Sequence, residues 1–302
     1  MAVRSGAALT LGAAFAVPLA RRRLRIPAPA TLVACASGPL ALAVLRPRSK
    51  KRDVALFALQ MWAFTMAHEV PYDDRESLRR RLRIRYPIAI DRFLGAGGLP
   101  NARLQRGLAR LGAVKAIDRV LTWVHWLWFL EPYCALAFIL VRRNERFPRA
   151  ARQLAAVFDI GCAVYFLAPT APPWWSSEQG LTGEGVRRIM VEVGEETWGS
   201  AWPGMYGALG GNPWAAMPSL HFATSLTMAL ALAEAGPLEG AAGWGYALAL
   251  GFSLVYLGVH YVTDLAAGAL LVIAVRRGER LAAPLVVRLN RSLQGLERLA
   301  SG

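Results

Sequence analysis

Long apolar segments separated by short arginine-rich connections constrain this chain more than any other feature of its sequence. Of its 302 residues, 55% are hydrophobic and 18% are charged, which is more apolar material than a soluble domain usually carries. Several segments approach the roughly 20 residues with which a helix crosses a bilayer. The arginines behind the net charge of +15 lie at the ends of these segments, which favours a membrane over nucleic acid as the partner. The sequence predicts an all-α, polytopic membrane helical bundle.

The apolar segments also predict a division of the chain. Six of them are expected to form the membrane core: 54–70, 120–141, 153–168, 218–235, 243–259 and 261–275. Two shorter ones, Ala7–Ala20 and Pro29–Leu45, precede the core, as a signal anchor or as the arms of a short hairpin. We therefore expect three parts: an N-terminal hydrophobic anchor or hairpin (1–52), a six-helix membrane domain (53–275) and a basic cytoplasmic tail (276–302).

The distribution of arginine predicts the orientation. The connections Arg46–Arg52 and Arg142–Arg152 and the tail from Arg276 onward are the most basic, which places them in the cytoplasm. Alternating the spans then puts the loop 169–217 and the junction near His260 on the extracytoplasmic side of a multi-pass cell membrane protein. The arginine-rich stretch 71–118 is predicted to lie in the headgroup plane, although a solvated charged face explains it equally well.

Neither a metal nor another cofactor is expected. The three cysteines, Cys35, Cys134 and Cys162, have no paired spacing, and the four histidines are scattered through the chain.

A helix-start signal surrounds the first informative histidine. Pro218 and Ser219 stand just before His221 and an apolar run, and proline at the entry with serine as the N-cap is typical of a helix N-terminus. Free backbone N–H groups and the positive end of the helix dipole meet there. These groups would bind a phosphate beside Ser219 and His221 without any additional binding residue.

The second histidine has an acidic companion. On a helix, His260 and Asp264 are four residues apart and share one face, so the carboxylate can fix the tautomer of the imidazole and leave a nucleophilic nitrogen. Phosphate-ester transfer needs such a nucleophile, a proton donor for the departing alkoxide and donors for the equatorial oxygens. His260, His221 and the Ser219 region supply one of each.

Two motifs carry a resemblance to a known family. Pro-Ser-Leu-His at 218–221 and His-Tyr-x-x-Asp at 260–264 resemble the second and third signature motifs of the type-2 phosphatidic acid phosphatase superfamily, and the six segments are similar to its six-helix core. The resemblance implies a metal-independent reaction without a cofactor. It also implies that His260 attacks phosphorus to form a phosphohistidine, that Asp264 orients it and that His221 protonates the leaving group.

The sequence departs from the superfamily at its cationic positions. Leu254 follows Ser253 where the third motif has arginine, and Leu167–Trp175 replaces the first motif with its Lys and Arg-Pro. This combination is similar to the inositol phosphorylceramide synthase branch, which moves a phosphorylated headgroup to an alcohol. Phosphatase and phosphotransferase therefore both stay open, as does a non-catalytic lipid-binding or transport protein with the same fold.

Further candidates surround this proposed centre. The candidates for phosphate binding are Ser219, Arg187, Arg188 and Lys115, and those for substrate binding are His68, Tyr261 and Asn212. An ordinary headgroup or solvent contact is the simpler explanation for each of these cations, and a solvated helix terminus explains His68 equally well. The expected partners are a lipid phosphate or phospholipid in the bilayer and a polyol acceptor. For His125, inside an apolar segment, we expect an interfacial or interhelical hydrogen bond.

Overall fold

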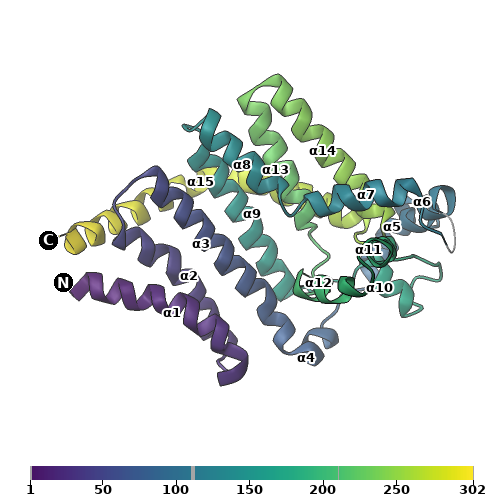
Figure 1. Ribbon diagram of the computed structural model, residues 1–302, viewed down its shortest axis with the longest axis horizontal. Helices are drawn as coiled ribbons and strands as arrows, with labels where there is room; N and C mark the ends of the chain where they lie inside the picture. Colours follow the sequence, from purple (N-terminus) through teal and green to yellow (C-terminus); the bar gives the residue numbers. More distant parts are fainter. Residues whose placement is uncertain (1, 110–112, 210, 302) are drawn as a thin grey trace. The chain divides into compact units, whose positions relative to one another are not determined.

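A computed structural model describes residues 2–109, 113–209 and 211–301, most of which are helical (Figure 1). Within these ranges no strand forms, and isolated bridges join Thr170 to Arg83 and to Ala215. The all-α prediction is confirmed. The chain divides into two compact units, one comprising the residues up to Arg75 together with those from Ala274 onward, and the other comprising Glu76–Ile273. Each unit is described by itself.

The first unit contains the N-terminal helices. It comprises α1 (Ala2–Leu24), α2 (Ala28–Leu45), α3 (Lys50–Glu69), the 3-10 helix η1 (Val70–Asp73) and the distal part of α15. A short turn joins α1 to α2, and these two helices pack against each other. Arg21 is buried and forms ion pairs with Glu69 at 2.9 Å and with Asp73 at 2.8 Å. Two of the acidic residues near the end of α3 are therefore engaged within this unit.

The second unit contains both histidine motifs. Its helices, beginning with one that straddles the boundary, are α4 (Arg75–Arg80), α5 (Arg85–Leu94), α6 (Pro100–Leu108), α7 (Ala116–Leu127), α8 (Glu131–Arg142), α9 (Phe147–Leu167), α10 (Pro173–Glu178), α11 (Ile189–Trp198), the 3-10 helix η2 (Gly199–Ala201), α12 (Trp202–Leu209), α13 (Leu220–Ala235), α14 (Pro237–Tyr256) and the start of α15 (Val262–Ser301). Because α15 continues to Ser301, the expected basic tail is helical. The three-part division of the chain stays a prediction.

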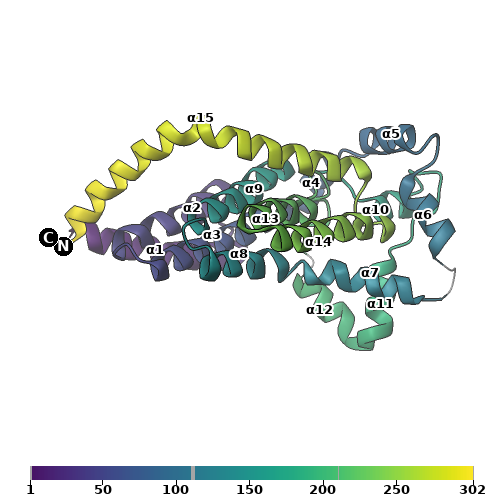
Figure 2. The same cartoon turned by 90° about the horizontal axis from the view of Figure 1, so that it is seen from above.

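A tight hairpin of α13 and α14 forms the centre of this unit. An ideal Cβ at Gly240 would lie 2.8 Å from the Cα of Ala233, and one at Gly243 would lie 2.8 Å from the Cα of Ala229. Small residues at such crossings let two membrane helices approach closely. Helix α13 also contacts α8 and α9, while α14 contacts α6 and α7 (Figure 2).

Several helices are suited to a membrane. By length and composition, α1, α2 and α9 could each cross one, and α7 with α8 adds a fourth candidate if this pair, bent by 51°, counts as one span. These helices support insertion into a membrane. Of the six predicted spans, α9 and the α7–α8 pair meet this test; α3, α13, α14 and α15 are helical without meeting it. The count of six spans stays a prediction.

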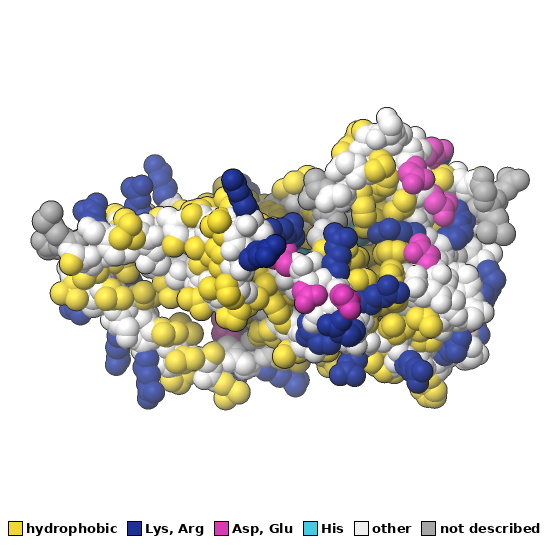
Figure 3. Space-filling view, turned by 90° about the horizontal axis from the view of Figure 1, so that it is seen from below, with side chains coloured by type: hydrophobic (Ala, Val, Ile, Leu, Met, Phe, Trp, Pro, Cys, Tyr) yellow, Lys and Arg dark blue, Asp and Glu magenta, His cyan; other side chains and the backbone are white. Residues whose placement is uncertain are grey.

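Outward-facing apolar side chains accompany these helices. Val141 on α8 is 78% exposed and Leu167 on α9 is 79% exposed, and Leu248 on α14 also points outward. Hydrophobic side chains occupy much of the face shown in Figure 3, interspersed with Lys and Arg. Apolar exposure on this scale is typical of a surface that contacts lipid.

Short helices cover the turn between α14 and α15. Tyr261 belongs to a buried cluster with residues of α5 and α6, and Tyr256 and Leu257 belong to a second cluster with α7 and α11. In both views of the ribbon α5, α6 and α11 gather at one end of this unit (Figures 1 and 2). The turn that carries His260 is thereby buried under helices outside the α13–α14 hairpin.

Candidate active site

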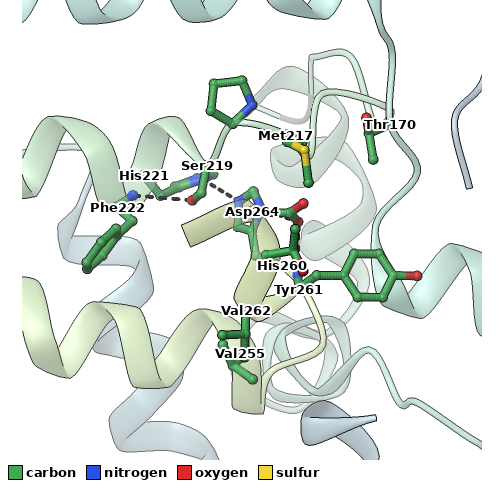
Figure 4. Close-up of polar contacts among 12 residues, drawn as sticks. Thr170, Met217, Ser219, His221, Phe222, Val255, His260, Tyr261, Val262 and Asp264 are labelled. Atoms are coloured by element: carbon green, nitrogen blue, oxygen red, sulfur yellow. Dashed lines mark hydrogen bonds and ion pairs between the residues drawn. The ribbon is translucent and has the colours of Figure 1, made fainter. Parts of the chain in front are cut away.

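Three side chains from two distant motifs form one chain of contacts (Figure 4). His221 Nδ1 lies 3.2 Å from His260 Nε2, and His260 Nδ1 lies 3.2 Å from Asp264 Oδ2. His260 is 2% exposed and Asp264 is fully buried, while His221 is partly exposed. The buried carboxylate accepts a hydrogen bond from the Nδ1–H group of His260, which leaves Nε2 of this ring facing His221.

The His260–Asp264 contact differs in one respect from its sequence-based interpretation. His260 precedes α15, whose first residue is Val262, so the pair spans the start of the helix and not one of its turns. Asp264 Oδ2 also accepts the backbone N–H of Tyr261 at 2.9 Å. One carboxylate oxygen therefore fixes both the imidazole and the backbone that enters α15.

Close packing and hydrogen bonds to its backbone carbonyls hold the turn that carries His260. Gly258 has φ +75°, which disfavours side-chain-bearing residues, and a Cβ there would lie 2.6 Å from the carbonyl oxygen of Arg187. The Gly258 carbonyl accepts the N–H of Trp174 at 3.1 Å. Asn101 donates through Nδ2 to the carbonyls of Val255, at 2.7 Å, and of His260, at 2.9 Å.

Two helix N-termini meet at the histidines. Ser219 caps α13, as predicted, by accepting the N–H of Phe222 at 3.3 Å. The N–H of Ser219 donates to the carbonyl of Asp264 at 3.0 Å, which joins the start of α13 to the first turn of α15. A Cβ at Gly268 would lie 2.8 Å from the Ser219 carbonyl oxygen, so glycine permits this approach. This bond holds the start of α13, with the positive end of its dipole, next to the start of α15.

A buried aspartate from another helix caps α15. Asp91 on α5 is fully buried and accepts the N–H groups of Val262 and Thr263, each at 2.9 Å, and the hydroxyl of Thr263. An N-cap is usually the residue just before a helix. Here the cap comes from more than 170 residues earlier in the chain, which ties α5 to the start of α15.

Asp91→Ala is expected to lower the free energy of unfolding by about 2–4 kcal/mol, because three donors at the start of α15 lose their acceptor. Thermal unfolding of the purified protein in detergent measures the effect. The matched control is Glu76→Ala, which removes an exposed ion pair with Arg80 and should change stability by less than about 1 kcal/mol. Equal stability of the two variants would contradict the assigned role of Asp91.

The two candidate arginines of the loop 169–217 have different surroundings. Arg187 pairs with Glu192, with a distance of 3.0 Å between Nε and Oε1 and a second contact through its terminal nitrogen. These hydrogen bonds raise the pKa of the Arg187 guanidinium above its ordinary value. The backbone of Arg187 bonds reciprocally with Gln105, whose amide also donates to the carbonyl of Tyr256. Arg187 therefore connects the loop 169–217, through Gln105, to the end of α14.

Arg188 stacks between aromatic rings. Its guanidinium lies 3.7 Å from the centroid of Trp174 and 4.9 Å from that of Tyr206, and it donates to the Tyr206 hydroxyl at 2.5 Å. Among the residues described, no carboxylate pairs with it, and its buried Nε has no hydrogen-bond partner. Because the backbone of Trp174 bonds Gly258, Arg188 is anchored beside the turn that carries His260.

The remaining candidates are less central or less well defined. Lys115 is exposed and donates to the carbonyl of Leu108 at 2.7 Å, at the opposite end of α7 from His125. Tyr261 is fully buried, and its ring points away from His221 in Figure 4. Asn212 is buried and accepts the N–H of Trp214 at 3.0 Å. His68 lies on α3, in the other compact unit.

Two further aromatic residues surround His221. The Trp128 ring lies 4.2 Å from the His221 ring, between centroids, and its Nε1 donates to Thr224 at 2.8 Å. The His125 ring lies 5.0 Å from the His221 ring. Neither ring nitrogen of His125 has a hydrogen-bond partner among the residues that the structure describes. The expected interhelical hydrogen bond of His125 is therefore wrong for the described residues, and the interfacial one stays a prediction.

Sequence reasoning missed the polar residues of the stretch 71–118 that hold the site. Asp91, Asn101 and Gln105 are all buried, and they bond to the end of α14, to the turn that follows it or to the start of α15. The arginine pattern of that stretch obscured them. Within the described ranges, no group of three or more His, Cys, Asp or Glu residues is placed to hold a metal ion.

The comparisons with known proteins agree with the motifs. No curated protein and no solved structure matches the chain. A family model described as the PAP2 superfamily matches residues 100–276, which is more than half of the chain and extends from α6 into α15. The matched region includes His221, His260 and Asp264. The chain belongs to the PAP2 superfamily.

Proposed function

We propose that this protein transfers a phosphoryl group, or a phosphorylated headgroup, from a membrane lipid through a covalent phosphohistidine on His260. The observation that carries the proposal is the chain of two 3.2 Å contacts from His221 through His260 to Asp264. Membership of the superfamily supports a phosphatase-type or phosphotransferase-type reaction. The apolar helices support a substrate that reaches the site from the bilayer.

The proposed reaction has two balanced steps. In the first, Nε2 of His260 forms a bond to phosphorus while the phosphorus–oxygen bond to the alcohol breaks, and protonated His221 gives its proton to the departing oxygen. In the second, now neutral His221 takes a proton from water or from an alcohol, whose oxygen displaces phosphorus from His260. Asp264 keeps the proton on Nδ1 of His260 and compensates the positive charge that develops on the ring.

The charge of the transition state requires donors other than the missing motif arginine. The N-terminus of α13 supplies a backbone dipole, and Arg188 is the best placed of the candidate cations, because Glu192 already neutralises Arg187. We propose Arg188 as the phosphate-binding cation and the reaction as metal-independent. Ser219 contributes through the helix that it caps.

Arg188→Gln is expected to lower kcat/KM about 100-fold, since one charged donor to the transition state is lost. Arg187→Gln is the matched control and should lower kcat/KM less than about fivefold. Both variants are assayed at constant salt concentration with the lipid that the wild type consumes. A larger loss in Arg187→Gln than in Arg188→Gln would reverse the assignment.

Transfer to an alcohol is the second candidate function. Leu254 is fully buried in α14, so the position that carries arginine in the superfamily's third motif adds an apolar side chain to the helix packing. This departure supports the inositol phosphorylceramide synthase-like branch, in which an alcohol such as inositol or a lipid hydroxyl replaces water as the acceptor.

Product analysis distinguishes these functions. The purified full chain in nanodiscs is incubated with phosphorus-labelled phosphatidic acid or phosphatidylinositol, with and without inositol or ceramide, and with and without EDTA. Free phosphate in the absence of an acceptor supports a phosphatase, and an acceptor-dependent lipid product with negligible phosphate supports a transferase. Loss of activity in EDTA would contradict metal independence. No product from any combination, with lipid binding intact, would identify a non-catalytic lipid-binding protein.

We propose that the site faces the extracytoplasmic side of the cell membrane, since the most basic connections should lie in the cytoplasm. A single cysteine at exposed Leu181, in a variant whose native cysteines are replaced by alanine, should react with a membrane-impermeant maleimide in intact cells. Labelling only after lysis would reverse the orientation.

A further inference from the structure

We propose that His125 is a further substrate-contacting residue, whose imidazole forms a hydrogen bond to the alcohol portion of the phosphate ester. The proposal deepens the function proposed above and rests on it. It starts from the position of His125 in the last turn of α7, where its side chain is 4% exposed. The His221 ring lies 5.0 Å from that of His125 and 5.3 Å from that of His260, so it contacts both.

The His125 imidazole is a buried polar group without a hydrogen-bond partner among the described residues. Both ring nitrogens of His125 are buried without a hydrogen-bond partner in the described chain, as is the hydroxyl of Thr122, three residues earlier on the same helix face. A buried polar group left unpaired costs about 1–3 kcal/mol, and such groups are rare in native proteins. An apolar residue would fill this position without that cost. A ligand oxygen that pairs with the imidazole explains its presence.

Helix α14 fixes the part of α7 that precedes His125. Ser253 donates to the carbonyl of Leu121 at 2.7 Å, and Tyr246 donates to the carbonyl of Val124 at 3.0 Å. Tyr256 donates to Asp118 nearer the start of α7. These three hydrogen bonds from α14 oppose a shift of α7. His125 is therefore not free to move to another protein partner. The ring is positioned before any ligand arrives.

The proposed reaction indicates which part of a ligand lies there. His221 gives its proton to the departing alcohol oxygen, so the alcohol portion of the substrate lies against His221 while phosphorus lies at His260. Other oxygens of the alcohol portion then lie beside His125, because the His125 ring contacts the His221 ring. A neutral imidazole offers one donor and one acceptor, which suits the hydroxyl or ester oxygens of an alcohol. Trp128, 4.2 Å from His221, borders the same place.

Kinetics of His125→Phe test the proposal. This variant removes both nitrogens but keeps an aromatic ring, and we expect it to raise KM about tenfold while kcat changes less than about threefold, as for a contact made equally in ground and transition states. His125→Gln restores a donor and an acceptor and should recover most of the wild-type KM. The control is Trp123→Phe on the exposed side of α7, which should leave both constants unchanged.

The outcomes separate this proposal from the proposed function. The lipid is phosphatidylinositol or phosphatidic acid, whichever the wild type consumes. A wild type that consumes neither refutes the proposed function. An active wild type together with a His125→Phe variant whose KM is within twofold of wild type overturns the role of His125 alone. Thermal unfolding reports folding, and if His125→Phe does not fold, His125→Met, with a flexible apolar side chain, takes its place in the same assay.

Discussion

His260→Ala is expected to reduce turnover by at least about 10⁴-fold, which is the scale of losing a nucleophile or its partner in comparable hydrolytic sites. The physical reason is that Nε2 of His260 is the nitrogen presented to His221, while Nδ1 is held by Asp264. Without this ring no covalent intermediate can form. The turn itself should persist, because Asn101 bonds to the backbone carbonyl of His260 and not to its side chain.

Two measurements check this expectation. Turnover of phosphorus-labelled lipid gives the rate, and acid-labile, base-stable radioactivity on the protein reports the phosphohistidine. The control is Cys134→Ala, which changes an exposed thiol on α8 and should keep both signals. More than about 1% of wild-type turnover in His260→Ala would show that the reaction does not pass through this residue.

His221→Ala is expected to produce a loss that depends on the leaving group. For a lipid alkoxide, removal of the general acid should slow the first step about 10²–10⁴-fold. A nitrophenolate leaves without protonation, so phosphohistidine formation from a nitrophenyl phosphate ester should be nearly as fast as in the wild type. The intermediate should then accumulate, because no base remains to activate water or an alcohol.

Rapid quenching distinguishes the two steps. The expected result is a burst of about one nitrophenolate per protein, with the labelled phosphate retained on His260. The double variant His221→Ala with His260→Ala should show no burst. An equal loss with alkyl and nitrophenyl esters would contradict the assignment of His221 as the proton donor.

Local sequence signals predicted the elements that carry the site. Proline and serine before an apolar run located the start of α13, and the structure places Ser219 at its N-cap. The four-residue spacing of His260 and Asp264 predicted their contact, although His260 lies before the helix and not within it. These features depend on neighbours in the chain, which is why the sequence alone was sufficient for them.

Long-range contacts escaped the sequence analysis. Asp91 and Gln105 bond to residues more than 150 positions away, and no spacing rule connects such partners. The bend between α7 and α8 follows a signal that was present, since Pro132 stands in the first turn of α8. The apolar pattern of 120–141 nevertheless predicts one continuous span. In the tail, the abundance of arginine obscured the helical continuation of α15.

The bond from the Ser219 amide to the Asp264 carbonyl has a consequence for how this protein can diverge. It joins main-chain atoms, so this link between the two backbone segments that carry the imidazoles uses no side chain. Specificity for a new lipid can therefore arise by exchanging the residues that face the ligand, with the spacing required for phosphorus chemistry preserved throughout.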